Sequence, residues 1–227
     1  MTFKQRVKEF INNDLIFSKM EKYVKLIEDK NKVMNLTGFK DDVLWEEGIY
    51  ESLIFMDRSF TKHINEKQNL VLDIGAGAGF PSVPYLIYNS NIKLTIYEPI
   101  QKRVDFLNLV SKELNLNIEV LKIRAEKSIE YEKFDFICAR AVTDLKKLIE
   151  ITNHLGKINS VFSFLKGPKV FQEWEEAKWI IDQLHIENIQ NIKIDTKNLK
   201  ENFTFSFVKK LKTKDGFPRK WENIVKK

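Results

Sequence analysis

A short apolar run that ends in three closely spaced glycines constrains this chain more than any other feature. Residues 70–74 (LVLDI) lead into Gly75, Gly77 and Gly79, three of only eight glycines among 227 residues. Glycine adopts positive φ angles without steric cost and lets the backbone approach a ligand closely. A strand, a glycine-rich turn and a helix in this order also present helix N-terminal amides at the turn. The segment therefore predicts a strand–turn–helix unit that binds a nucleotide-like ligand.

Apolar runs of strand length alternate with helical stripes from residue 70 onward. We expect strands at 70–74, 93–97, 118–123, 134–139 and 161–165. Helices are expected at 84–88, 104–114, 145–155 and after Gly167-Pro168, the last with Trp174, Ala177, Trp179, Ile180 and Leu184 on its inner side. Two further strands, 186–194 and 203–211, are joined by too few residues for a crossover helix, so they should form an antiparallel hairpin. This order is typical of an α/β fold with a mostly parallel sheet of seven strands.

The first 66 residues show helical periodicity instead, with apolar side chains such as Phe3, Val7, Phe10 and Ile11 three or four positions apart. No internal repeat or low-complexity linker separates them from the alternating strands and helices. We therefore expect an N-terminal helical cap over residues 1–66 that packs on an α/β domain over residues 67–227, as one compact unit.

The composition excludes several classes of protein. With 43% hydrophobic and 31% charged residues the chain is neither disordered nor collagen-like. No apolar stretch approaches the roughly 20 residues of a membrane span, and the N-terminus has no signal-peptide core. The single Cys138 and the scattered His63, His154 and His185 lack the spacing of a zinc site. These features predict a cytoplasmic protein without disulfide or structural metal.

The net charge of +6 is concentrated at the C-terminus. Residues 209–227 contain eight Lys or Arg and two acidic residues, so this tail carries the whole excess. A positive field confined to one part of a molecule attracts polyanions. The charge distribution is consistent with a basic patch for a polyanion, and also with a solubilising Lys-rich end.

The glycine spacing narrows the choice of ligand. The pattern is Gly-x-Gly-x-Gly, whereas the dinucleotide fingerprint Gly-x-Gly-x-x-Gly would require glycine in place of Phe80. Glu98 ends the next expected strand, where a carboxylate can accept both hydroxyls of a ribose. A ligand with a ribose and an adenine but no phosphates is S-adenosylmethionine. We expect a Rossmann-like, class I S-adenosylmethionine-dependent methyltransferase fold.

Seven segments then make a resemblance specific. They are residues 31–37 (NKVMNLT), 73–84 (DIGAGAGFPSVP), 98–107 (EPIQKRVDFL), 124–126 (RAE), 134–142 (FDFICARAV), 166–167 (KG) and 218–220 (PRK). Their order and spacing resemble those of the RsmG (GidB) family over nearly the whole chain. Members of that family are bacterial methyltransferases that modify N7 of a guanine in the decoding-region loop of small-subunit (16S) rRNA.

The resemblance implies roles for individual residues around the cofactor S-adenosylmethionine. Gly75, Gly77 and Phe80 would line its methionine and ribose side, and Glu98 would hold the ribose. Ala125 and Glu126 look like the pair that flanks the adenine. Arg140, at the end of the fourth strand, resembles the arginine that faces both cofactor and substrate, and it is the candidate catalytic residue.

Basic residues near these positions are the candidate RNA contacts. Lys102 and Arg103 are expected in the first turn of a helix, where the helix dipole disfavours cations, and such a violation suggests a functional reason. The full expected set is Lys102, Arg103, Arg124, Lys166, Arg219 and Lys220. The partner would be 16S rRNA within the small ribosomal subunit, bound by a monomer.

The expected reaction needs little acid–base chemistry. The lone pair of guanine N7 lies in the ring plane and is already nucleophilic, so methyl transfer requires in-line positioning instead of proton removal. A covalent role for Cys138 is not expected, because a cysteine inside an apolar run is usually a small core residue. We expect the guanine to be extruded from its stack into a pocket that Arg140 helps to shape.

Two departures from the family pattern leave other functions open. Residues 47–52 read EGIYES where relatives have an Arg-His pair before an Asp-Ser step, and Ser82 replaces a glycine. A glycine at position 48 inside a helix costs about 1 kcal/mol relative to alanine. The alternatives are a methyltransferase that acts on another RNA or a protein, and a catalytically silent RNA-binding assembly factor.

Overall fold

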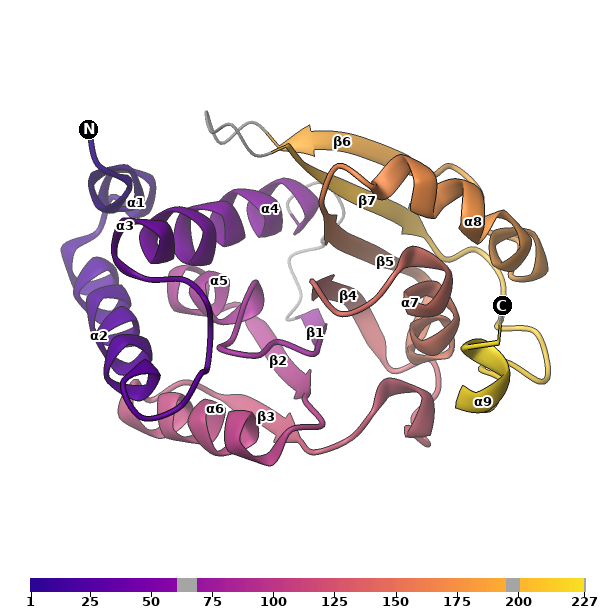
Figure 1. The fold of residues 1–227 in the computed structure, drawn as a ribbon, viewed down its shortest axis with the longest axis horizontal. Helices are drawn as coiled ribbons and strands as arrows, with labels where there is room; N and C mark the ends of the chain where they lie inside the picture. Colours follow the sequence, from indigo (N-terminus) through magenta and orange to yellow (C-terminus); the bar gives the residue numbers. More distant parts are fainter. Residues whose placement is uncertain (61–68, 195–200, 227) are drawn as a thin grey trace.

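The computed structural model describes residues 1–60, 69–194 and 201–226. Its centre is a seven-stranded sheet with the strand order β3-β2-β1-β4-β5-β7-β6 (Figure 1). The first five strands in this order form four parallel pairs, and β7 pairs antiparallel with both β5 and β6. The strands are β1 (Asn69–Ile74), β2 (Ile92–Tyr97), β3 (Ile118–Leu121), β4 (Phe134–Arg140), β5 (Gly156–Lys166), β6 (Gln190–Ile194) and β7 (Asn202–Val208). The expected α/β fold with a C-terminal hairpin is confirmed.

Helices cover both faces of the sheet. On one face, α4 (Glu51–Phe60), α5 (Ser82–Tyr88) and α6 (Gln101–Glu113) lie in Figure 1 with α1 (Phe3–Ile11) and α2 (Asp14–Asn31) outside them. On the other face lie α7 (Leu145–Thr152), α8 (Val170–Gln183) and the short α9 (Trp221–Ile224). Two hydrophobic clusters match this division, one on each side of the sheet. Between α2 and α4 the chain forms α3 (Asp41–Val43) and a π-helix, η1 (Leu44–Tyr50).

The strand register brings the carboxyl ends of the central strands together. Ile74 at the end of β1 pairs with Tyr97 of β2 and with Ala139 of β4. Arg140 of β4 pairs in turn with Leu165 of β5. Open α/β sheets bind ligands in the crevice outside these ends, at the point where strand order reverses. Here that point lies between β1 and β4.

The N-terminal helices are attached to the glycine turn itself. The Tyr23 hydroxyl in α2 donates a 2.6 Å hydrogen bond to the Ala78 carbonyl, and its ring meets the Phe80 ring edge-on at 6.2 Å. Both aromatic side chains are buried. The N-terminal helix α2 therefore packs against the glycine turn of the α/β part, and the expected boundary at residues 66 and 67 lies outside the described residues. None of the described helices is both long and apolar enough to cross a membrane.

Three local expectations are wrong. Trp179 is 45% exposed, because residues two apart on a helix point about 200° apart and the buried Ala177 occupies the inner side. β6 begins at Gln190 and not at Ile186, because the Ile186 amide closes the end of α8 by donating to the Ile181 carbonyl at 3.0 Å. β7 ends at Val208 and not at Leu211. The Lys209 backbone still bonds Ser160 and Asn159, and the Lys209 ammonium donates to the Asn153 and Gly156 carbonyls in the interior.

Candidate active site

The glycine turn after β1 has the backbone conformation that only glycine adopts readily. Gly75, Gly77 and Gly79 have φ angles of +66°, +60° and +108°. At Gly79 a Cβ atom would also lie 2.7 Å from the Tyr23 hydroxyl and from Val83. The Gly75 amide donates to the Tyr97 carbonyl at 2.8 Å, which fastens the turn to β2. The turn is therefore held in a fixed position beside the end of β2.

Glu98 connects two backbone segments at the end of β2. Its Oε2 accepts the Gly77 amide at 3.1 Å and its Oε1 accepts the Ile100 amide at 3.0 Å. The side chain is only 1% exposed, and the Arg103 guanidinium lies 3.8 Å from Oε2. Each carboxylate oxygen has a further lone pair after these bonds. Glu98 can therefore accept two hydroxyl groups from a ligand while it holds the turn in place.

A cavity of about 390 Å³ opens beside this carboxylate. Its walls include Gly75, Glu98, Arg103, Ala125, Glu126 and Trp221. The sequence alone did not indicate Trp221, although it directly follows the 218–220 segment of the resemblance. The Arg124 guanidinium lies 5.8 Å from the centre of the Trp221 ring. The C-terminal segment thus supplies one wall of a cavity that otherwise belongs to the sheet.

Unpaired polar atoms show what this cavity can hold. Among the described residues, Glu126 Oε1 and Arg103 Nε are buried and have no hydrogen-bond partner. An unpaired buried polar group costs free energy unless a ligand or water satisfies it. One acceptor, one donor and the Glu98 carboxylate suit a polar nucleoside with hydroxyl and amino groups. The residues present therefore fit S-adenosylmethionine.

Two of the expected cofactor residues occupy other places. Phe80 is 6% exposed and packs against Tyr23 and Phe39 in the core instead of facing the cavity. Gly77 acts through its amide, which donates to Glu98. Gly48, a departure from the family pattern, lies in the π-helix η1, and a Cβ there would come within 2.9 Å of the Phe80 ring. A side chain at position 48 would therefore force the Phe80 ring and the Leu44 side chain to move.

Arg140 links the end of β4 to the N-terminal helices. Its Nη2 lies 2.7 Å from Glu51 Oε2, and its Nη1 donates to the Glu47 carbonyl. The Glu51 carboxylate also accepts the Asn202 side-chain amide. Burial lowers the pKa of Arg140, and the charges of Glu51 and Glu47 act in the opposite direction.

A second cavity, of about 510 Å³, lies next to the first. The two cavities share the wall formed by residues 141–143, directly after β4. Other walls of the second cavity are Phe39, Arg140, Lys166, Glu173 and Asn202. A ligand in the first cavity and a second ligand in the other cavity would come closest to each other at residues 141–143. Arg140 faces the second cavity and does not line the first.

Comparison with known proteins decides the family. The family model GidB, rRNA small subunit methyltransferase G, matches residues 16–203. The chain is 42% identical over 213 residues to the ribosomal RNA small subunit methyltransferase G of Mycoplasmopsis pulmonis, covering 92% of each chain. It is 45% identical over 179 residues to that of Mesomycoplasma hyopneumoniae strain 7448, covering 78% of this chain and 87% of the relative. The chain belongs to the GidB family. It is accordingly an S-adenosylmethionine-dependent rRNA methyltransferase.

Solved structures agree on the fold. A SAM-dependent methyltransferase from Aquifex aeolicus superposes with a TM-score of 0.53 at 21% identity, covering 70% of this chain and 91% of that one. A precorrin-6y C5,15-methyltransferase from Geobacter metallireducens superposes with a TM-score of 0.51 at 12% identity, covering 68% of this chain and 86% of that one. At these identities the likeness concerns the fold alone, and it confirms the class I methyltransferase architecture.

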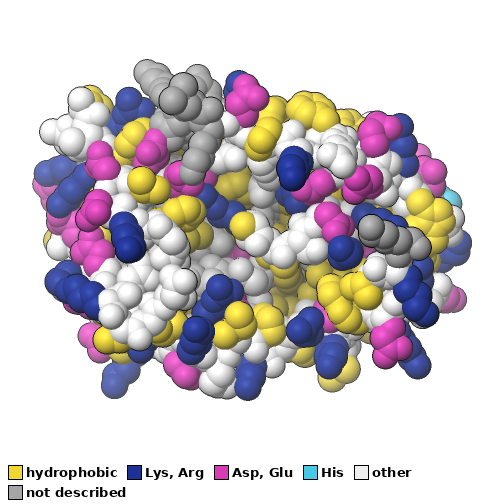
Figure 2. Space-filling model, viewed as in Figure 1, with side chains coloured by type: hydrophobic (Ala, Val, Ile, Leu, Met, Phe, Trp, Pro, Cys, Tyr) yellow, Lys and Arg dark blue, Asp and Glu magenta, His cyan; other side chains and the backbone are white. Residues whose placement is uncertain are grey.

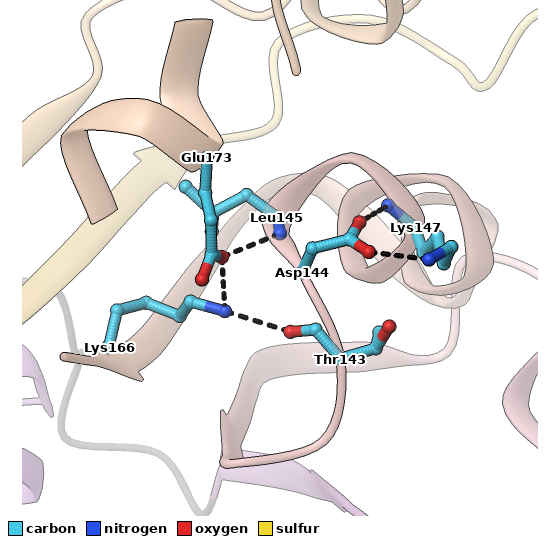
Figure 3. A network of polar contacts seen from close by, with 6 residues as sticks. All are labelled: Thr143, Asp144, Leu145, Lys147, Lys166 and Glu173. Carbon is cyan, nitrogen blue, oxygen red and sulfur yellow. Dashed lines mark hydrogen bonds and ion pairs between the residues drawn. The ribbon is translucent and has the colours of Figure 1, made fainter. Parts of the chain in front are cut away.

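The structure separates the basic residues of this GidB-family chain into two groups. Lys102, Arg124 and Lys220 are exposed. Arg219 instead makes a two-pronged ion pair with the fully buried Glu150, with both distances 2.7 Å. Lys166 is 8% exposed and pairs with Glu173 (Figure 3). Figure 2 shows Lys and Arg side chains along the lower edge of the hollowed face, where Figure 1 places α6 and β3.

Cys138 lies inside β4 with no exposed surface. Burial raises the pKa of its thiol well above the usual range, and the nearby Asp73 acts in the same direction. The nucleophilic thiolate is thus disfavoured. Cys138 is a core residue. Among the described residues, no group of three or more His, Cys, Asp or Glu side chains could hold a metal ion.

Asp73, one residue before the end of β1, is a second buried carboxyl group next to the turn. It is 0% exposed and its Oδ2 accepts the Ser82 amide at 3.3 Å. Burial raises the pKa of Asp73 to about 7, against the effect of the Ser82 hydrogen bonds. The folded protein therefore keeps a proton on Asp73 that the unfolded chain releases at about pH 4.

This shift predicts a pH-dependent stability. Between about pH 4 and 7 the folded state binds more protons than the unfolded state, so the contribution of Asp73 to the free energy of unfolding falls as the pH rises. Asp73→Asn should remove the effect, and its stability relative to the wild type should increase across this range by up to about 4 kcal/mol. Urea unfolding of both proteins from pH 4 to 8 measures the difference. A constant difference would contradict the prediction.

Proposed function

We propose that this chain transfers the methyl group of S-adenosylmethionine to N7 of a guanine in the decoding-region loop of 16S rRNA. The observation that carries the proposal is the pair of adjoining cavities at the carboxyl ends of β1, β2, β4 and β5, which share residues 141–143 as a wall. A cofactor cavity alone would suit any methyltransferase. A second large cavity at the shared wall suits an extruded nucleobase.

The residues of the first cavity bind and orient the cofactor. S-adenosylmethionine supplies a methyl group on a positively charged sulfur. Glu98 holds the two ribose hydroxyls, and Glu126, whose Oε1 has no partner among the described residues, accepts from the adenine amino group. Gly75, without a side chain, leaves the turn open at Val142, which lies 3.0 Å from where its Cβ would be.

The residues of the second cavity position the base. Guanine N7 needs no proton removed, so the contribution of the protein is alignment of the lone pair with the sulfur–methyl bond. Arg140 is held by Glu51 and by the Glu47 carbonyl, and this fixes the wall next to the shared residues 141–143. The π-helix η1 thereby connects the N-terminal helices to the substrate side of the site. Arg140 shapes the pocket and acts on no proton.

The exposed Lys and Arg side chains bind the RNA phosphates in this proposal. Arg124, directly before η2 (Ala125–Lys127), lines the first cavity. Lys102 lies on α6, next to Arg103, and Lys220 directly precedes α9. Lys166 and Arg219 have carboxylate partners inside the fold and are structural in this proposal. Both cavities are lined by one chain, so a monomer suffices. The reaction takes place in the cytoplasm, on rRNA within the small ribosomal subunit.

The experiment that tests this function maps 7-methylguanosine. Small ribosomal subunits that lack the modification are incubated with the protein and S-adenosylmethionine, and then treated with borohydride and aniline, which cleave the rRNA at 7-methylguanosine. We expect one cofactor-dependent cleavage in the decoding-region loop. If cofactor binding is measured and a control enzyme works but no cleavage appears, the substrate is another molecule.

Charge reversal at Lys102 tests the RNA surface. Lys102→Glu should raise KM for the subunits by about tenfold at 0.1 M salt. The slope of log affinity against log salt concentration should become shallower by about 1, which corresponds to one lost phosphate contact. Affinity for S-adenosylhomocysteine should stay unchanged, since Lys102 is exposed and does not line the cofactor cavity. The matched control is Lys178→Glu, an exposed cation on α8. Equal KM values for both variants would exclude Lys102 from the RNA surface.

A further inference from the structure

The second cavity contains a carboxylate that has no part in cofactor binding or methyl transfer. Glu173, in the first turn of α8, lines this cavity together with Lys166 and Thr143 (Figure 3). Its side chain is 21% exposed. A carboxylate beside a nucleobase pocket needs a partner, because charged groups are costly to desolvate alone.

The hydrogen bonds of Glu173 involve only one of its oxygens. Oε2 accepts the Lys166 ammonium at 2.5 Å and the Leu145 amide at 3.0 Å. The Lys166 ammonium also donates to the Thr143 carbonyl at 2.8 Å, so it links Glu173 to the shared wall. Among the described residues, Oε1 has no partner, and Figure 3 shows it pointing away from Leu145. The carboxylate is thus fixed in position with one oxygen free to accept.

We propose that Glu173 recognises the Watson–Crick edge of the target guanine, with Lys166 as the residue that positions it. The inference rests on the proposed function. Guanine presents two adjacent donors on that edge, N1–H and the N2 amino group, on the opposite side of the base from the N7 imidazole ring. Oε1 has two lone pairs, so this one free oxygen can accept both donors, which would leave N7 free to face the shared wall at residues 141–143.

The same arrangement excludes adenine. Adenine has an unprotonated N1 on the corresponding edge, which would set a lone pair against the carboxylate oxygen. A site built around a charged acceptor rejects a ligand that lacks the matching donors more strongly than an apolar pocket rejects a change of size. Glu173 would therefore supply specificity for guanine, whereas S-adenosylmethionine in the first cavity would supply the methyl group.

Glu173→Gln is the informative variant. The glutamine oxygen can replace Oε2 toward Lys166 and Leu145, while its amide nitrogen places a donor where Oε1 accepted. We expect kcat/KM on unmodified small subunits to fall at least thirtyfold and the Kd of S-adenosylhomocysteine, measured by calorimetry, to stay within twofold. Glu175→Gln, an exposed carboxylate on the same helix paired with Lys178, is the matched control and should leave both values unchanged.

A modified substrate separates recognition from structural support. Small subunits are reconstituted with 16S rRNA that carries inosine, which lacks only the N2 amino group, in place of the target guanosine. Wild-type protein should prefer guanosine at least tenfold, which is about 1.4 kcal/mol, and Glu173→Gln should have lost this preference.

The two experiments distinguish failure of the inference from failure of the proposed function. If kcat/KM of the variant falls by the same factor on both substrates, so that the wild-type preference for guanosine is kept, Glu173 does not recognise the base and the inference is overturned. If wild-type protein binds S-adenosylhomocysteine but modifies neither substrate, the proposed function itself is wrong, and this inference falls with it.

Discussion

Replacing Glu98 with alanine should raise the dissociation constant of S-adenosylhomocysteine at least a hundredfold. Glu98 is 1% exposed and lines the cavity proposed for the cofactor. Two ribose hydroxyls bound to a carboxylate contribute about 1.5–3 kcal/mol each, which corresponds to a factor of at least a hundred when both are lost. The substitution also removes the acceptor of the Gly77 and Ile100 amides, so the turn itself loosens.

Calorimetry with S-adenosylhomocysteine measures this change directly. Glu98→Gln, which keeps one oxygen, should fall between wild type and Glu98→Ala. Asp105→Ala is the matched control, because Asp105 is an exposed carboxylate on the neighbouring helix α6 that bonds only Gln101 among the described residues. Circular dichroism and thermal unfolding distinguish lost binding from lost folding. A folded Glu98→Ala protein with wild-type affinity would remove Glu98 from the cofactor site.

Arg140→Met is expected to destabilise the protein by about 3–5 kcal/mol, because it leaves the Glu51 carboxylate buried without its charged partner. The side chains of Arg140 and Glu51 are 11% and 4% exposed, with 2.7 Å between Nη2 and Oε2. Urea unfolding gives the change in the free energy of unfolding. Methylation should also be lost, because Arg140 lines the cavity proposed for the base.

The double variant Arg140→Met with Glu51→Gln distinguishes the two effects. It removes both charges and keeps an oxygen to accept the Asn202 amide. We expect most of the stability to return, while methylation of small subunits stays at least a hundredfold below wild type and cofactor binding is retained. Recovery of activity together with stability would mean that Arg140 serves only the fold.

Most of the fold could be predicted from local sequence patterns. The alternation of apolar runs and helical stripes was sufficient to predict the strands and helices of an α/β sheet, and the short polar link predicted the antiparallel β6–β7 pair. Trp179 was misplaced because the apolar stripe of α8 is broader than its buried side. The start of β6 was missed because Ile186 serves the end of the preceding helix.

The candidate site was predicted in part. Gly75 and Glu98 could be placed at the carboxyl ends of β1 and β2, because each directly follows an apolar run of strand length, and both line the first cavity. The orientation of Phe80 could not be predicted, because the local sequence does not distinguish an aromatic side chain that faces a ligand from one that packs in the core. Trp221 and Glu173 gave no signal, because nothing near them in sequence indicates that they line the two cavities.

Local patterns were sufficient for the strands, the glycine turn and the family resemblance, because these follow from backbone conformation and from short motifs in a fixed order. The availability of each charge depends instead on packing between distant segments. Arg219 forms an ion pair with Glu150, 69 residues away, and Arg140 forms one with Glu51 of the N-terminal helices. A buried ion pair requires two side chains to be desolvated together, and that depends on packing that no local pattern encodes. Of the six expected RNA-binding cations, the fold therefore leaves Lys102, Arg124 and Lys220 exposed.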